Sequence, residues 1–99
     1  MEAIARILPG LMKQLGLEER ATGWRAVSEW PALVGASIAA HARASSFHDG
    51  ILTVEVDGSA WMQELSLMKR ELVRKTNAHL GATVVREVRL VRGGSQRWV

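Results

Sequence analysis

Basic side chains are concentrated in the last third of this sequence, where they could bind anions. Residues 69–99 hold eight Lys and Arg against two acidic residues, whereas residues 1–68 hold five against eight. This split predicts one positive surface, suited to phosphate groups or to an acidic patch on a protein. The candidate binding cations are Lys69, Arg70, Arg74, Lys75 and Arg86.

Four of these cations fall on one predicted helix. Arg70 and Arg74 are four residues apart and share a face, with Lys69 and Lys75 on its flanks. Glu71 and Lys75 have the spacing of a favourable ion pair. A solvated helix face followed by a basic tail explains the same charges, so both interpretations stay open.

The histidines, serines and carboxylates form no recognisable catalytic or metal-binding pattern. His41, His48 and His79 lack an i,i+4 spacing, and the sequence has no cysteine. Two serines near His48 and Asp49 lie on a predicted strand and turn, where water is not excluded. We therefore expect no enzymatic activity, no metal, no cofactor and no small-molecule substrate.

Four tryptophans accompany one phenylalanine and no tyrosine. Trp24, Trp30 and Trp61 have helical phases that face the predicted sheet, which favours core positions. Trp61 also lies at a helix start beside polar residues, so it is a candidate partner contact as well. Trp98 has no pattern around it and is interpreted as a mobile or contact residue.

Apolar periodicity predicts three helices in the first half of the chain. The first has apolar residues at 4, 7, 8, 11 and 15 and is interrupted by Pro9 and Gly10. The second ends near Trp30, because Pro31 disfavours helical geometry in the residue before it. Pro31 then opens a third helix, which runs to about Arg43.

The second half predicts a hairpin, a long helix and another strand. Asp49-Gly50 is a tight-turn signal, and the alternation after it predicts a strand with one buried face. A single helix is expected from about Ala60 to Leu80, with Gly81 ending it. Residues 83–91 are rich in β-branched side chains and predict the third strand.

This element order predicts an α+β fold, a three-stranded sheet covered on one face by helices. We expect one domain over residues 1–92 and a flexible tail over 93–99. The outer sheet face presents Thr53, Glu55 and Asp57, which do not stack on bases. The expected core residues are Trp24, Trp30, Leu52, Val54, Val56, Leu65, Met68 and Leu72.

The sequence suggests a location in the cytoplasm. No apolar run approaches the roughly 18–20 residues that span a bilayer, and the charged beginning does not resemble a signal peptide. The absence of cysteine fits a reducing compartment. We expect a cytoplasmic, nucleoid-associated protein without a membrane partner.

Short motifs across residues 24–92 carry a family resemblance. They are Trp30, Val34-Gly35, His41, DGILTVEV at 49–56, SAWMQEL at 59–65, and Asn77 to Gly81. In this order and spacing they resemble the DciA family, which is linked to recruitment of the bacterial replicative helicase.

The resemblance implies a K-homology-like fold and a non-enzymatic adaptor that binds a DnaB-type replicative helicase and assists its recruitment to DNA in replication. Single- or double-stranded DNA is a further expected partner. Many family members carry a long basic extension, whereas this sequence is little more than the domain. It also has no Gly-x-x-Gly loop of the kind that clamps nucleic-acid backbones, which favours helicase contact over autonomous DNA loading.

Two alternatives come from the residues themselves. A stand-alone nucleic-acid-binding module would contact phosphates through the basic helix. A purely structural homodimer would pair through an exposed strand edge.

Overall fold

The structure, a computed structural model, describes residues 16–93. The predicted helix over residues 4–15, most of the predicted tail, and Trp98 lie outside the described residues. The described elements are α2 (Leu17–Ser28), α3 (Trp30–Val34), α4 (Ala36–Ala39), β1 (Ala42–His48), β2 (Ile51–Val56), α5 (Ser59–Ser66), α6 (Lys69–Leu80) and β3 (Glu87–Arg92).

The sheet has the strand order β1-β2-β3, with β2 in the centre. β1 pairs antiparallel with β2 through a tight turn in which Asp49 and Gly50 have φ values of 50° and 78°. Two successive positive φ angles match the twist of a hairpin. β3 pairs parallel with β2, and α5 and α6 form the connection between them. The predicted α+β class and three-stranded sheet are confirmed.

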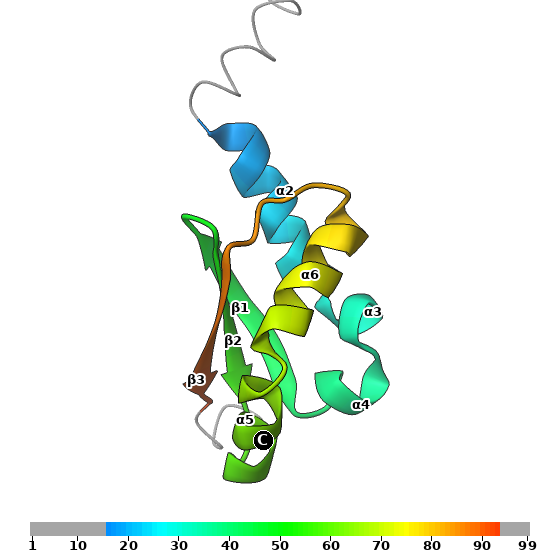
Figure 1. The fold of residues 1–99 in the computed structure, drawn as a ribbon, viewed down its shortest axis with the longest axis vertical. Coiled ribbons are helices and arrows are strands. Elements are labelled where there is room, and N and C mark those ends of the chain that lie inside the picture. Colours follow the sequence, from blue (N-terminus) through cyan, green and yellow to red (C-terminus); the bar gives the residue numbers. More distant parts are fainter. Residues whose placement is uncertain (1–15, 94–99) are drawn as a thin grey trace, which may run out of the picture.

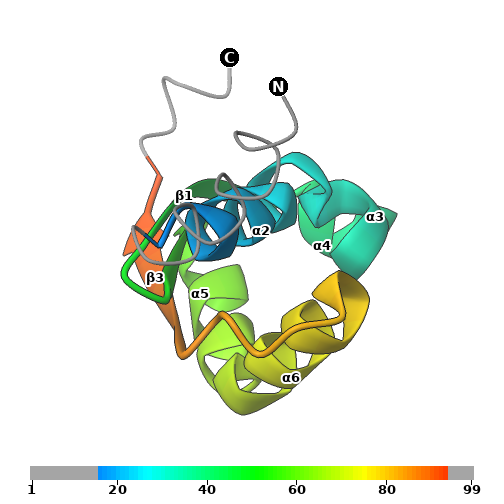
Figure 2. The same ribbon diagram turned by 90° about the horizontal axis from the view of Figure 1, so that it is seen from above.

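All described helices lie on one side of the sheet (Figures 1 and 2). Leu52, Val54 and Val56 alternate along β2 and are fully buried against this helical layer. Leu65 of α5 and Leu72 of α6 are buried in the same core, whereas Met68 between them packs at its edge and is half-buried. Among the described helices, none is long and apolar enough to cross a bilayer.

Trp30, the first residue of α3, is part of the core and bonds to β1. Its ring is buried, and its indole Nε1 donates a hydrogen bond to the Ala42 carbonyl at 3.0 Å. The indole N–H therefore has the partner that a buried tryptophan requires.

The core prediction for Trp24 is wrong, because 46% of this side chain is exposed. α2 approaches β1 through its small residues, and a Cβ added at Gly23 would lie 2.2 Å from the Phe47 ring. Gly23 and Ala26 are buried at this contact. Trp24 follows Gly23 by about 100° around the helix, so it points away from the sheet.

The predicted long helix is two helices, because the chain tightens at Leu67 and Met68. The Met68 N–H bonds to the Leu65 carbonyl, only three residues back. The Ser66 hydroxyl donates to the Gln63 carbonyl at 2.8 Å, and this carbonyl also accepts the long Leu67 N–H bond of 3.4 Å. Serine hydroxyls that compete for helical carbonyls in this way favour a bend.

Two other boundaries differ from the prediction. Gly35, with φ 89° and ψ 164°, divides the third predicted helix into α3 and α4. The third strand begins at Glu87, because the backbone just before it is hydrogen-bonded to the side chain of Asn77. The Asn77 amide oxygen accepts from Val84 N and Val85 N at 3.1 and 2.9 Å, and its nitrogen donates to the Val85 carbonyl at 2.9 Å.

Candidate partner-binding surface

The cations predicted as one surface point in different directions. Lys69 and Arg70, at the start of α6, face β3 and line a groove with Arg86. Arg74 and Lys75 are exposed on α6 but do not line this groove. Because residues around a helix are separated by 100°, Lys75 lies on the far flank from Lys69. The predicted basic surface therefore divides.

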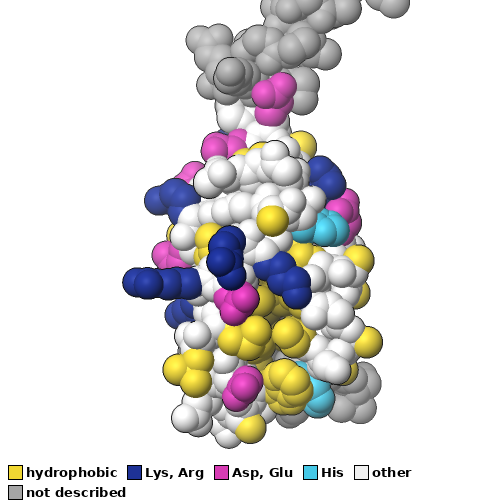
Figure 3. All heavy atoms as spheres, turned by 45° about the vertical axis from the view of Figure 1, so that its right-hand side comes forward, with side chains coloured by type: hydrophobic (Ala, Val, Ile, Leu, Met, Phe, Trp, Pro, Cys, Tyr) yellow, Lys and Arg dark blue, Asp and Glu magenta, His cyan; other side chains and the backbone are white. Residues whose placement is uncertain are grey.

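The groove between α6 and β3 has a volume of about 250 Å³. Val73 and Val88 supply apolar surface, and Glu87 is the acidic residue of its lining. Three cations around an apolar groove can accept an acidic or phosphorylated ligand. Figure 3 shows Lys and Arg side chains gathered in the middle of the face that carries α6.

Arg86 also has a structural role. Its guanidinium donates a hydrogen bond to the Asp49 carbonyl, and its side chain lies against Gly50 of the hairpin turn. The Arg86 N–H donates to the Gly50 carbonyl at 2.7 Å. Arg86 thus ties the hairpin to the approach of β3, so removing it would disturb the fold as well as the groove.

Glu71 was expected to pair with Lys75, but it pairs with Arg74 instead. Glu71 Oε1 lies 3.3 Å from Arg74 Nη2, and both side chains are exposed. Exposed pairs of this kind contribute little to stability. Arg74 is therefore partly neutralised, which leaves Lys69 and Arg70 as the stronger binding candidates.

Trp61 is half-buried at the start of α5 and packs against the edge of the core. Its ring stacks on His41, with centroids 4.8 Å apart and an interplanar angle of 15°. His41 Nδ1 lies 3.9 Å from Asp57 Oδ2, and the Asp57 N–H donates to the His41 carbonyl at 2.7 Å. Trp61 is therefore held in a fixed orientation while part of its ring stays accessible.

A hollow of about 350 Å³ opens beside Trp61, lined also by Ala60, Glu64 and Met68. Figure 3 shows hydrophobic side chains gathered in the lower half of this face, the half in which α5 lies in Figure 1. Leu67 follows at the bend and is 81% exposed. We name this surface the α5–α6 shoulder; it consists of Trp61, Leu67, Met68, Lys69 and Arg70.

Leu67 was not identified from the sequence, although a signal was present. It lies 200° around a helix from the buried Leu65. Helical periodicity therefore predicts that this apolar side chain is exposed to solvent. Exposed apolar residues that adjoin one another are typical of contact surfaces.

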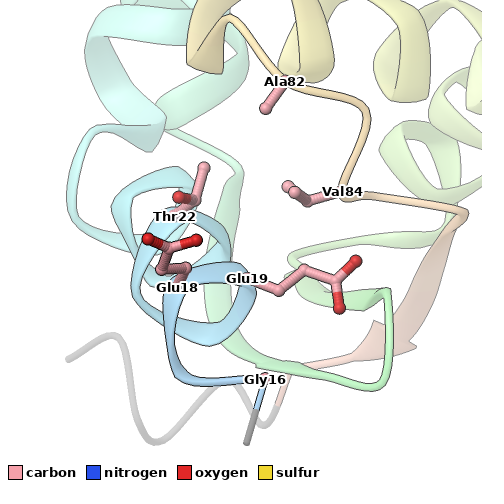
Figure 4. Close-up of a pocket in the computed structure, with 6 residues that line it drawn as sticks. All are labelled: Gly16, Glu18, Glu19, Thr22, Ala82 and Val84. Atoms are coloured by element: carbon pink, nitrogen blue, oxygen red, sulfur yellow. The ribbon is translucent and has the colours of Figure 1, made fainter. Parts of the chain in front are cut away.

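A second hollow, of about 410 Å³, lies at the start of α2 (Figure 4). Its lining comprises Gly16, Glu18, Glu19, Thr22, Ala82 and Val84. Two carboxylates without a lining cation make it unsuitable for phosphate. Across residues 16–93, no three potential metal ligands cluster together.

Comparison with known proteins gives a family. A family model described as "Dna[CI] antecedent, DciA" matches residues 3–90. The chain belongs to the DciA family.

Curated relatives agree with this family match. A UPF0232 protein of Mycobacterium tuberculosis (strain H37Rv) is 33% identical over 88 residues, which is 89% of this chain and 47% of the relative. A UPF0232 protein of Rhodococcus jostii is 31% identical over the same shares of the two chains. One of Mycolicibacterium smegmatis is 28% identical over 98% of this chain and 50% of the relative. The chain thus spans about half the length of the curated relatives it matches.

Proposed function

We propose that this chain is a non-enzymatic adaptor that binds a DnaB-type replicative helicase and assists its recruitment to DNA. Membership of the DciA family supports a role in DNA replication connected with helicase loading. The observation that carries the proposal is the α5–α6 shoulder, where apolar side chains stay accessible beside two cations.

The shoulder has the composition of a protein contact. Trp61 and Met68 border a hollow that an apolar side chain can enter. Leu67, next to Met68 in the chain, is exposed. Aromatic residues and arginine supply much of the binding energy in protein interfaces. Lys69 and Arg70 adjoin this apolar surface and favour a partner with acidic residues around an apolar centre.

A pull-down with the organism's own replicative helicase, with and without DNA, tests the proposal. Reversing two charges with Lys69→Glu and Arg70→Glu should weaken helicase binding at least tenfold, because each reversal replaces attraction with repulsion. Lys75→Glu is the matched control, since it removes a cation from the far flank of the same helix and should leave binding within about twofold.

Circular dichroism should show the same fold for all variants, because each substituted side chain is exposed. Equal helicase binding by the double variant and the control would contradict the proposed surface. No binding by the unchanged chain would contradict the proposed partner.

A stand-alone nucleic-acid-binding module is the second candidate, supported by the groove that Lys69, Arg70 and Arg86 line. A phosphate ligand in this groove would release counterions, so DNA affinity should fall steeply between low and moderate salt. The Lys69→Glu and Arg70→Glu variant should then lose this salt dependence. An absence of DNA binding even at low salt would eliminate this candidate.

A further inference from the structure

The hollow beside Trp61 carries a carboxylate among its apolar residues. Trp61, Glu64 and Met68 line it together with Ala60, and its volume is about 350 Å³. Residues 61 and 64 lie about 60° apart around a helix, so the ring and the carboxylate share one face of α5. Glu64 is exposed, and within residues 16–93 it forms no ion pair. The hollow therefore combines an aromatic surface with an uncompensated negative charge.

One face of the Trp61 ring is already covered. His41 stacks on it at a centroid distance of 4.8 Å, and Asp57 lies 3.9 Å from His41 Nδ1. His41 is not part of the lining of the hollow, so the hollow lies against the remaining surface of the ring. Figure 3 shows hydrophobic side chains between a histidine and an acidic side chain in the lower part of this face. A ligand in the hollow would thus meet Trp61 and Glu64 together.

The neighbouring cations line a different hollow. Lys69 and Arg70 face β3 and contribute to the groove with Arg86, whereas none of the three lines the hollow beside Trp61. Because Coulomb energy falls with distance, they oppose a cation in that hollow less than the Glu64 carboxylate at its rim attracts it. The α5–α6 shoulder therefore adjoins a negative site and a positive one.

We propose that the hollow beside Trp61 binds an arginine side chain of the partner. A guanidinium stacks on an indole and donates to a carboxylate, so Trp61 and Glu64 supply both of its usual contacts. Met68 would pack against the aliphatic stem of the arginine. Phosphate and carboxylate ligands are disfavoured here, because Glu64 repels them.

This inference deepens the proposed function and rests on it for the identity of the partner alone. The helicase segment that docks on the shoulder would carry an arginine for the hollow and acidic residues for Lys69 and Arg70. Such a charge pattern gives the contact a defined direction, because a reversed segment would place like charges together.

A small probe tests the hollow without any helicase. N-acetyl-arginine amide carries one positive charge, and N-acetyl-citrulline amide is a neutral compound of similar shape. In the full chain, we expect the arginine probe to shift the Trp61 indole NMR signal saturably, with about fivefold higher affinity than the citrulline probe. The Trp24 signal, from an exposed tryptophan of α2, is the internal control and should stay in place.

Two variants show which groups bind the probe. Glu64→Gln should lower the affinity for the arginine probe by about two- to fivefold, the range of an exposed charge pair. Glu18→Gln, which changes an exposed glutamate of α2, is the matched control and should leave this affinity unchanged. Trp61→Leu should also weaken binding of the arginine probe, as read from the Met68 methyl signal.

Equal affinities for the arginine and citrulline probes would overturn the proposal, as would an arginine affinity that survives Glu64→Gln. N-acetyl-leucine amide tests an apolar occupant. Tighter binding of this probe than of the arginine probe would assign the hollow to an apolar side chain and overturn the inference.

The helicase pull-down separates this inference from the proposed function. Glu64→Arg should weaken helicase binding about fivefold or more, because it replaces attraction with repulsion, whereas Glu18→Arg should leave it unchanged. Unchanged helicase binding by Glu64→Arg would overturn the arginine contact and leave the proposed function intact. No helicase binding by the unchanged chain would contradict the proposed function, while the probe shifts would still decide the chemistry of the hollow.

Discussion

The contact of α2 and α3 with β1 and the α5–α6 shoulder use tryptophan in opposite ways. At the first, Gly23 and Ala26 bring the helix against the sheet, and Trp30 is buried with its N–H bonded. At the second, Trp61 stacks on His41 at the core edge and stays partly exposed. The first region stabilises the fold, whereas the second leaves part of an aromatic side chain accessible to a partner.

The largest expected effect is at this contact with β1, where α3 contributes Trp30. Trp30→Ala should lower the free energy of unfolding by about 3–5 kcal/mol, because it removes a buried ring and its hydrogen bond. Urea denaturation followed by circular dichroism measures this change. Trp30→Phe retains most of the volume and should cost less; an equal cost for both variants would assign the effect to the lost N–H alone.

A smaller effect is expected when the same contact is overfilled. Gly23→Ala places a Cβ about 2.2 Å from the Phe47 ring, so α2 must shift or the ring must move. Overpacking of this kind should cost about 1–3 kcal/mol in thermal or urea denaturation. Phe47→Leu in the same chain should recover part of this loss, and strictly additive costs would show that the two sites do not interact.

Trp61→Ala tests the other region, the α5–α6 shoulder. Because part of the ring is already in water, the free energy of unfolding should fall by only about 1–2 kcal/mol. Helicase binding in the pull-down should decrease while circular dichroism shows a folded chain. A stability loss as large as that of Trp30→Ala would remove the distinction between the two regions.

The smallest expected effect concerns the junction of α2 and α6. Glu29 accepts from Arg25 at 3.1 Å and lies 2.8 Å from His79 Nε2, and these two contacts lower the pKa of Glu29 below its ordinary value of 4.5. A lowered pKa in the folded state adds stability above pH 4.5, which is lost as pH falls through the folded value. Glu29→Gln should therefore flatten the acid limb of stability measured from pH 6 to pH 3. An unchanged acid limb in that variant would exclude a contribution from this junction.

Local patterns in the sequence are sufficient to place the hairpin and the sheet core. Asp49-Gly50 and the alternation of Leu52, Val54 and Val56 depend on neighbours in the chain, so the sequence alone predicts them. Trp24 could not be placed in this way. Its exposure follows from the close approach of Gly23 to Phe47, a contact between residues far apart in the sequence.

The candidate site was predicted less completely for a similar reason. Residue type marked Lys69, Arg70 and Trp61 as binding candidates, but not their directions. The bend at Leu67 sets these directions, and the Ser66 hydroxyl, which competes for the Gln63 carbonyl, favours it. Helical periodicity across residues 60–80 continues through the bend, so it gives no sign of a break.

The parallel pairing of β3 with β2 has a consequence for synthesis of the chain. The β1–β2 hairpin is local and can form as soon as it leaves the ribosome, whereas β3 begins thirty-one positions after β2 ends. Until then the central strand presents an open edge to neighbouring nascent chains, which is a hazard for intermolecular association. Rapid docking of α6, whose Asn77 holds the backbone that leads into β3, would shorten this interval.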